Sequence, residues 1–305
     1  MTRTTDRPKP LRERVDGVLL LDKPSGISSN AALQRARRVL GAAKAGHTGT
    51  LDPLATGLLP LAFGESTKFS QALLDADKAY RATVKLGVST STGDAEGEVL
   101  SRAPVAVNAA QLAAAAECFR GEIEQMPPMY SALKHAGKPL YVYAREGVDI
   151  ERKRRRVHIY DLQCTLLADD TFDMVVRCSK GTYVRTLGED IGHMLGCGAH
   201  LTALRRTAIG RFGIEDALSM AQVEAEGLAA RARLLPVDCL IGALPALTLP
   251  DADAHRLCQG QCVPLDGTPA GDYRVYLGTT FLGLGRVDDS AVLRSRRLVS
   301  TGEGA

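Results

Sequence analysis

The chain has 305 residues, of which 45% are apolar, and it carries 38 basic against 35 acidic side chains for a net charge of +3. Its length suits one large and one small domain, and its apolar content excludes an intrinsically disordered protein. The small net charge does not by itself diagnose a nucleic-acid-binding protein. No apolar run reaches the ~18 residues of a membrane span, and the polar N-terminus lacks the pattern of a secretion signal. We expect a globular protein of the cytoplasm.

Seven cysteines are scattered along the chain, and this odd number fits free thiols better than a disulfide framework. Two pairings bear on a metal site: Cys258 with Cys262, and Cys197 with His200. Neither has the CxxC spacing of structural zinc sites. We therefore expect neither disulfides nor a bound metal.

The first elements surround an unusual loop. Residues 1–14 have no apolar periodicity and predict a disordered tail. A strand over 17–22, a turn over 23–26 and a helix over 31–40 follow, and the helix is closed by Gly41. These elements deliver the chain to residues 46–57.

Residues 46–57 read GHTGTLDPLATG and place an ionisable His47 and a carboxylate, Asp52, in a segment rich in glycine. Pro53 fixes its own φ and keeps Asp52 out of the α region, so we expect Asp52 on a rigid turn. Local chemistry leaves two interpretations open. Either Asp52 caps the turn by accepting backbone N–H bonds and His47 lies on the surface, or both side chains take part in chemistry.

The later elements alternate between helix and strand. In chain order we expect a half-buried strand over 79–87, an Ala-rich helix from the capping box of Asn108 and Gln111 to Gly121, a short helix over 140–146, antiparallel strands over 156–167 and 171–178, a helix over 182–195, a strand or turn over 199–207, and a helix over 217–235. Short β-like runs over 273–277, 280–284 and 291–293 predict a small β domain at the C-terminus.

Basic residues gather in one part of the chain. Residues 151–214 hold eleven basic and seven acidic side chains, including five consecutive cations at 152–156. Clustered cations gain affinity for a polyanion by releasing its counterions. The run at 152–156 is therefore either a phosphate contact or simply a solvated lead-in to a strand.

Arg185 falls in the first turn of the helix over 182–195, where a cation works against the helix dipole. Such a residue usually has an anionic partner, and Asp52 is a candidate. The pair would keep the carboxylate ionised and oriented, although a purely structural ion pair would look the same in the sequence.

Several stretches combine polar groups with apolar surroundings: residues 17–29, 46–57, 78–80, 178–185 and 204–212, with a further segment at 128–141. In this order they resemble the TruB family of tRNA pseudouridine-55 synthases, and the resemblance covers about residues 15–215. It implies an α+β fold, with a pseudouridine synthase catalytic domain around a mixed, mostly antiparallel sheet over 15–243. A small C-terminal all-β PUA-like domain with a frayed end would occupy 244–305, on position and size alone.

The resemblance also implies roles for individual residues. Asp52 would be the nucleophile, Arg185 would orient it, Tyr80 would stack on the target base and assist proton removal from C5, Tyr183 and Leu204 would complete the pocket, and His47 would fill the space left by the flipped base. Lys180, Arg205 and Arg206 would hold RNA phosphates. The uracil is detached from ribose C1′, turned and rejoined through C5, with no cofactor or metal, and the target of the carboxylate, sugar or ring, stays open.

Two other functions fit part of the sequence. An RNA-binding or RNA-folding protein with vestigial catalytic residues would be free to lose the Asp, both Tyr and the Arg, yet all are present. A hydrolase using His47 and Asp52 as an acid–base pair lacks a Ser or Cys nucleophile motif. We therefore expect a cytoplasmic monomer that acts on the T-arm stem-loop of tRNA, with no membrane contact and no obligate protein partner.

Overall fold

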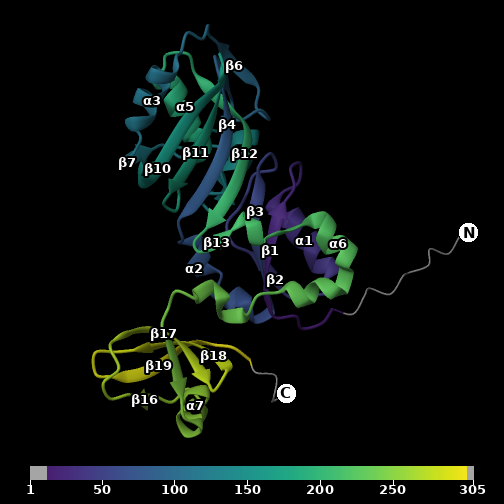
Figure 1. The fold of residues 1–305 in the computed structure, drawn as a ribbon, viewed down its shortest axis with the longest axis vertical. Coiled ribbons are helices and arrows are strands. Elements are labelled where there is room, and N and C mark those ends of the chain that lie inside the picture. The colour runs from purple at the N-terminus through teal and green to yellow at the C-terminus, as the bar shows by residue number, and fades with distance from the viewer. Residues whose placement is uncertain (1–11, 301–305) are drawn as a thin grey trace, which may run out of the picture.

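The computed structural model describes residues 12–300. Most of the tail expected over 1–14, and the frayed end expected at 301–305, lie outside the described residues. Within them, Glu13 forms an isolated β-bridge with Ala42. Figure 1 shows a long twisted sheet with helices on it and a separate small sheet at the C-terminal end of the chain.

The large sheet has ten strands. They are β1 (Gly17–Lys23), β2 (Ala45–His47), β3 (Thr56–Phe63), β4 (Lys78–Leu86), β7 (Gly121–Gln125), β10 (Arg155–Ala168), β11 (Thr171–Cys178), β12 (Ala199–Ile209), β13 (Phe212–Gly213) and β14 (Leu218–Ser219). Their order is β14-β1-β3-β12-β4-β11-β10-β7, with β2 beside β3 and β13 beside β12. Within this sheet β1 pairs with β14 and β3 with β12 in parallel, and the other pairings are antiparallel. The predicted mixed, mostly antiparallel sheet is confirmed.

Two small hairpins extend from the sheet, formed by β5 (Val88–Thr90) with β6 (Val99–Arg102) and by β8 (Lys134–His135) with β9 (Lys138–Pro139). The helices are α1 (Ser29–Val39), α2 (Gln71–Leu74), α3 (Ala109–Glu117), α4 (Leu140–Arg145), α5 (Val184–Met194), α6 (Met220–Glu226) and α7 (Asp251–Cys258). Short 3-10 helices are η1 (Gly64–Phe69), η2 (Ile214–Asp216), η3 (Gly227–Arg233) and η4 (Val237–Ile241). No helix within residues 12–300 has the length and apolar character needed to cross a membrane.

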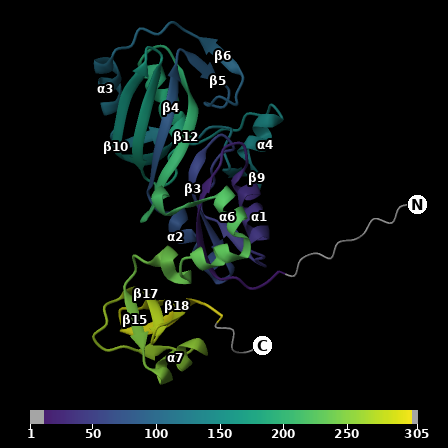
Figure 2. The ribbon, with the colours of Figure 1, turned by 45° about the vertical axis from the view of Figure 1, so that its right-hand side comes forward.

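The large sheet has two halves. In one, α3 and α5 pack on β10 and β12, and in the other α1 and α6 pack together beside β1, as Figures 1 and 2 show. The halves meet where β3 and β12 pair briefly, through Thr56 with Arg205 and Gly57 with Arg206. Gly57 has φ +102°, and a Cβ there would lie 2.3 Å from the carbonyl oxygen of Arg206, so this close approach requires glycine. The loop that precedes β3 is therefore fixed at the junction.

Most sequence-based expectations for individual elements hold. The alternation in β4 buries Tyr80, Ala82, Val84 and Leu86, and the capping box of Asn108 and Gln111 starts α3. The helix expected over 217–235 is wrong in two respects. It begins only at Met220, because Leu218 and Ser219 form β14. It is interrupted at Gly227, whose φ of +57° ends α6 and gives way to η3.

In the large sheet and its hairpins, the strands β2, β3, β5 to β9, β13 and β14 were not expected. Two of them have informative sequences. β3 contains Pro60, a residue that normally argues against a central strand. β7 begins at Gly121, which the sequence pattern assigned only to a helix end. Because β2 ends at His47 and β3 starts at Thr56, the connecting loop is limited to residues 48–55.

The C-terminal unit has its own sheet and core. Its strands are β15 (Ala246–Leu249), β16 (Val263–Pro264), β17 (Gly271–Leu277), β18 (Thr280–Val287) and β19 (Val292–Leu298), in the order β15-β17-β18-β19-β16. The expected PUA-like strands are confirmed, and α7 adds a helix to them. Phe69 of η1 packs edge to face on Phe281 of β18, which joins the two units. The boundary at 243/244 stays a prediction.

Candidate active site

The loop over 48–55 is held from the N-terminal half of the protein. The Ser29 hydroxyl at the start of α1 donates to Leu51 O at 2.9 Å and accepts from Leu51 N at 2.8 Å. The Gly26 N–H donates to Pro53 O at 2.9 Å. These bonds lie on both sides of Asp52, so its backbone is fixed and its side chain faces the junction of the two halves.

Arg185 is the partner of Asp52, as the sequence predicted. Its Nη2 lies 3.0 Å from Asp52 Oδ2, and its Nη1 lies 3.5 Å from Asp94 Oδ2. The same guanidinium donates at 2.6 Å to the carbonyls of Thr92 and Tyr130. The side chain is 7% exposed, whereas that of Asp52 is 40% exposed. A buried cation with four acceptors therefore holds a carboxylate that still faces solvent.

The structure adds Asp94, which the sequence analysis did not single out. Its side chain is 5% exposed, accepts from Thr92 Oγ1 and from the Glu96 N–H, and gives Arg185 a second carboxylate. The available signal was an acid flanked by Gly93 and Gly97, a pattern similar to that around Asp52. No spacing rule links residue 94 to residue 185, so only the fold brings them together.

The pKa of Asp52 is raised, chiefly because burial disfavours its charged form, and the negative charge of Asp94 adds to this rise. The cations of Arg185 and Lys23 lower the same pKa. Arg185 therefore acts in the expected direction, but burial outweighs it. A partly buried carboxylate that is held by one strong donor is a suitable nucleophile.

A cleft of about 640 Å³ opens in front of this pair. Its lining includes His47, Asp52, Asp94, Tyr130, Tyr141 and Arg185. Figure 2 shows α4, which supplies Tyr141, beside the end of the sheet half that carries α1. This volume is that of a small-molecule or nucleotide pocket.

His47 borders the cleft but does not pair with Asp52. Burial lowers the pKa of its imidazole, and the nearby Arg206 cation lowers it further, while a hydrogen bond that the imidazole donates to the backbone of Gly49 opposes the change. Its Nδ1 is buried without a hydrogen-bond partner in the described residues. A neutral imidazole at the rim suits stacking and hydrogen bonding better than acid–base work beside Asp52.

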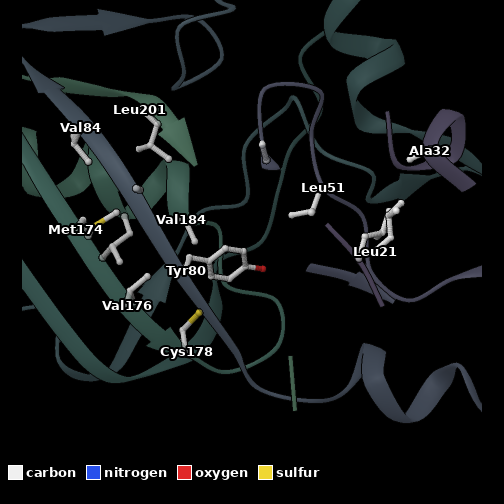
Figure 3. Close-up of a cluster of buried hydrophobic side chains, with 14 of the residues drawn as sticks. Leu21, Ala32, Leu51, Tyr80, Val84, Met174, Val176, Cys178, Val184 and Leu201 are labelled. Atoms are coloured by element: carbon white, nitrogen blue, oxygen red, sulfur yellow. The ribbon is translucent and has the colours of Figure 1, made fainter. Parts of the chain in front are cut away.

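Three predicted pocket residues lie near Asp52 but do not line the cleft. Tyr80 is 8% exposed, and Figure 3 shows its ring extending from β4 toward Leu51, the neighbour of Asp52. Leu204 lines a narrow hollow behind Asp52 and Arg185. Tyr183 caps the N-terminus of α5, and its backbone bonds the amide of the buried Gln125 in both directions. Each therefore comes from a different element around Asp52.

The predicted phosphate contacts differ in exposure. Lys180 is on the surface and pairs with Asp75 at 2.8 Å, and Arg205 pairs with Asp22 through two bonds of 3.0 and 2.7 Å. Arg206 is 1% exposed and donates to Leu58 O. Its assignment to phosphate was therefore wrong, because a side chain enclosed under the loop is not accessible to an RNA backbone.

The basic run at 152–156 is divided by the fold. Arg152 donates to Pro127 O and pairs with Asp149 at 3.3 Å, which makes it a structural contact. Arg156 faces Glu122 across the sheet at 3.4 Å. Arg155 lies at the start of β10 near Gly181. The members of the run thus have different surroundings, and a phosphate contact by any of them stays a prediction.

Comparison with known families gives the class of protein first. Models described as "TruB family pseudouridylate synthase (N terminal domain)", "tRNA pseudouridylate synthase B C-terminal domain" and "Pseudouridine synthase II TruB, C-terminal" match residues 37–184, 185–241 and 245–299. The chain thus has the fold of a pseudouridylate synthase, an RNA-modifying isomerase. The chain belongs to the TruB family.

Individual relatives agree with this membership. The tRNA pseudouridine synthase B of Azoarcus sp. (strain BH72) is 57% identical over 96% of this chain and 98% of its own length. That of Thiobacillus denitrificans is 57% identical over 96% and 99%. Among solved structures, a chain from the crystal structure of a Cbf5-Nop10-Gar1 complex aligns with a TM-score of 0.69 at 25% identity, covering 95% of this chain and 85% of that one.

Proposed function

We propose that the protein converts uridine 55 in the T-loop of tRNA to pseudouridine, with Asp52 as the nucleophile. The observation that carries this proposal is the ion pair of Asp52 with the buried Arg185 at the wall of a cleft large enough for a nucleotide. Close relatives over nearly the whole chain bear the name tRNA pseudouridine synthase B. The expected cytoplasmic location and monomeric state belong to this proposal, as does the T-arm as its binding partner.

The geometry suits covalent catalysis without a metal. Asp52 attacks the bound nucleotide, the N1–C1′ bond breaks, the uracil turns, and a C5–C1′ bond forms. Arg185 keeps the carboxylate oriented throughout because its remaining donors are committed to Asp94 and to the Thr92 and Tyr130 carbonyls. The partly enclosed cleft limits the water that would intercept a detached base.

The target uridine has to leave the stack of its loop before the cleft can enclose it, at a cost of a few kcal/mol. In this proposal His47 fills the vacated position, since a largely neutral imidazole stacks without a large desolvation cost. Tyr80 stacks on the captured base, and Leu204 and Tyr183 border it. Lys180 and Arg205 contact phosphates by exchanging their present carboxylate partners for the RNA backbone.

Substitution of the nucleophile tests the proposal. We expect Asp52→Ala to lower the release of tritium from 5-labelled uridine in a T-arm RNA by at least ~10⁴-fold, with RNA affinity near that of the wild type. Asp170→Asn is the matched control, because Asp170 is an exposed carboxylate paired with Lys85 at the far end of β4. Persistent release in Asp52→Ala, or modification of another uridine by the wild type, contradicts the proposal. Free uracil as the product indicates the hydrolase instead.

A further inference from the structure

Arg206 is a buried cation that the function described so far does not use. It is the largest fully buried side chain of the described residues, with 1% of its surface exposed. None of the ion pairs within residues 12–300 includes it, and its Nη2 has no hydrogen-bond partner there. Its Nε donates to Leu58 O at 2.7 Å. A buried charge without a counter-charge destabilises a fold, so its presence needs another reason.

The position of Arg206 suggests that reason. In the antiparallel pairing of β12 with β4, Arg206 lies directly opposite Tyr80. Directly opposite residues of two strands point to the same face, with Cβ atoms ~5 Å apart. On the other side, a Cβ at Gly49 would lie 3.4 Å from Arg206 Nη1. The guanidinium is therefore enclosed between Tyr80 and the loop that carries Asp52.

The charge of Arg206 acts on the phenol. Burial raises the pKa of Tyr80, and the Arg206 cation is the largest influence in the opposite direction. The other charged or titratable groups that act on this phenol are Cys178 and Asp52, and both raise the same pKa. Arg206 is thus the principal group that favours negative charge on the Tyr80 oxygen.

We propose that Arg206 is a positioning residue for Tyr80, whose unneutralised charge orients the phenol toward the bound base and stabilises its phenolate form. This inference rests on the proposed function, in which the base rejoined through C5 has to lose the C5 proton. The buried face of β12 thereby takes part in the reaction without contacting RNA.

In this inference the Tyr80 phenolate is the base that removes the C5 proton of the rejoined uracil. The C5–H bond breaks and its proton passes to the Tyr80 phenolate, which becomes a phenol. The C–H electron pair forms the C5–C6 double bond, and the pair of the C6–N1 double bond moves to N1, which takes a proton from solvent. The phenol then returns its proton to solvent, so the net change is an isomerisation.

A double-mutant cycle tests the inference. We expect Arg206→Met to lower kcat for pseudouridine formation about 30-fold while KM for a T-arm RNA stays within about twofold, since a general-base step contributes ~10²–10⁴-fold and Arg206 supports only part of it. Combined with Tyr80→Phe, the same substitution is expected to add less than about threefold, because the two residues act as one unit. Arg206→Lys, which keeps the charge, is expected to recover part of kcat. Arg81→Met is the matched control, since Arg81 lies next to Tyr80 but on the open face, paired with Asp173.

The outcomes separate the two proposals. The role of Arg206 is overturned if Arg206→Met has the kcat of the wild type. It is also overturned if Arg206→Met lowers kcat as much in the Tyr80→Phe variant as in the wild type, in an enzyme that still makes pseudouridine. A fall in kcat matched by a fall in unfolding free energy in urea, with no rescue by Arg206→Lys, indicates a purely structural residue and overturns it as well. If Arg206→Met does not fold, the cycle of Arg206→Lys with Tyr80→Phe decides by the same criterion. A wild-type protein that forms no pseudouridine rejects the proposed function instead.

Discussion

The buried cations on the two sides of the loop over 48–55 have different partners: carboxylates on one side and backbone carbonyls on the other. On the side of the cleft, Arg185 is neutralised by Asp52 and Asp94. On the inner side, Lys23 is fully buried and donates to the carbonyls of Pro24 and Ile27 at 2.9 and 2.7 Å, and Arg206 donates to that of Leu58. Backbone carbonyls satisfy donors but leave the charge in place. The cleft side therefore gains a fixed geometry from its ion pairs, whereas the inner side keeps a positive field beneath the nucleophile.

The largest expected effect comes from breaking the paired side. Arg185→Met leaves the buried Asp94 without its cation, so we expect a loss of about 3–5 kcal/mol of unfolding free energy in urea. We also expect a fall in kcat of at least about 10²-fold, because Asp52 loses its orienting donor.

The double variant Arg185→Met with Asp94→Asn is the control for this effect. It removes the unpaired charge, so stability should recover in part while activity stays low. If Arg185→Met alone has the unfolding free energy of the wild type, the ion pairs of Arg185 do not stabilise the cleft side of the loop.

The unpaired side is tested through Lys23. Burial is the main cause that lowers the pKa of its ammonium from 10.5 to about 8, and the charge of Asp52 opposes this shift. Between these two values the unfolded chain binds more protons at this site than the folded protein does. The unfolding free energy should therefore rise with pH across this window, by on the order of 1–3 kcal/mol.

Lys23→Met should flatten this rise, because it removes the titrating group. Lys78 also has a lowered pKa, so the measurement is the difference between the wild-type and variant curves from urea unfolding at pH 7.5 to 10.5. Parallel curves would mean that Lys23 is not held as a destabilised cation.

A smaller effect of opposite sign belongs to Glu189, one turn beyond Arg185 in α5. Burial chiefly raises the pKa of its carboxyl from 4.5 to about 7, and Asp190 and Asp94 add to the rise while Arg185 opposes it. Between these values the folded protein binds more protons, so unfolding free energy falls as pH rises. Glu189→Gln should remove about 1 kcal/mol of this fall, measured by urea unfolding at pH 4.5 and 7.5. If Glu189→Gln shows the same difference in unfolding free energy between pH 4.5 and 7.5 as the wild type, the charge of Glu189 near Asp52 and Asp94 does not destabilise the fold.

The smallest expected effect lies on the surface. Lys180 is already paired with Asp75, so its exchange to a phosphate gains little. We expect Lys180→Ala to weaken T-arm RNA binding only a few-fold and to reduce the slope of log K against log salt by about one. Lys85→Ala, at the far end of β4, is the matched control. An equal change in both variants would remove Lys180 from the RNA-binding surface.

Much of the candidate site was predictable because it depends on local chemistry. The pattern of glycine and proline around Asp52 indicates a rigid turn, and a cation in a first helical turn usually has an anionic partner. Asp52 was a candidate partner of Arg185, and the fold brings the two side chains together. The contact of Asp94 with Arg185 was not predicted, because nothing in the position of Asp94 in the sequence indicates which helix it contacts. Strand β3, which pairs mainly with β1, was not predicted because Pro60 argues against a strand at this position.

Arg205 and Arg206 mark the limit of what the sequence by itself determines. It determines that two cations follow Leu204 on a strand and that successive side chains point to opposite faces. It does not determine which face is covered. Only the tertiary structure decides this, because the loop over 48–55 and β4 come from distant parts of the chain and close over Arg206 while leaving Arg205 beside Asp22. Burial is a property of the assembled fold, and burial turns one of two equivalent cations into a source of positive field at the phenol of Tyr80.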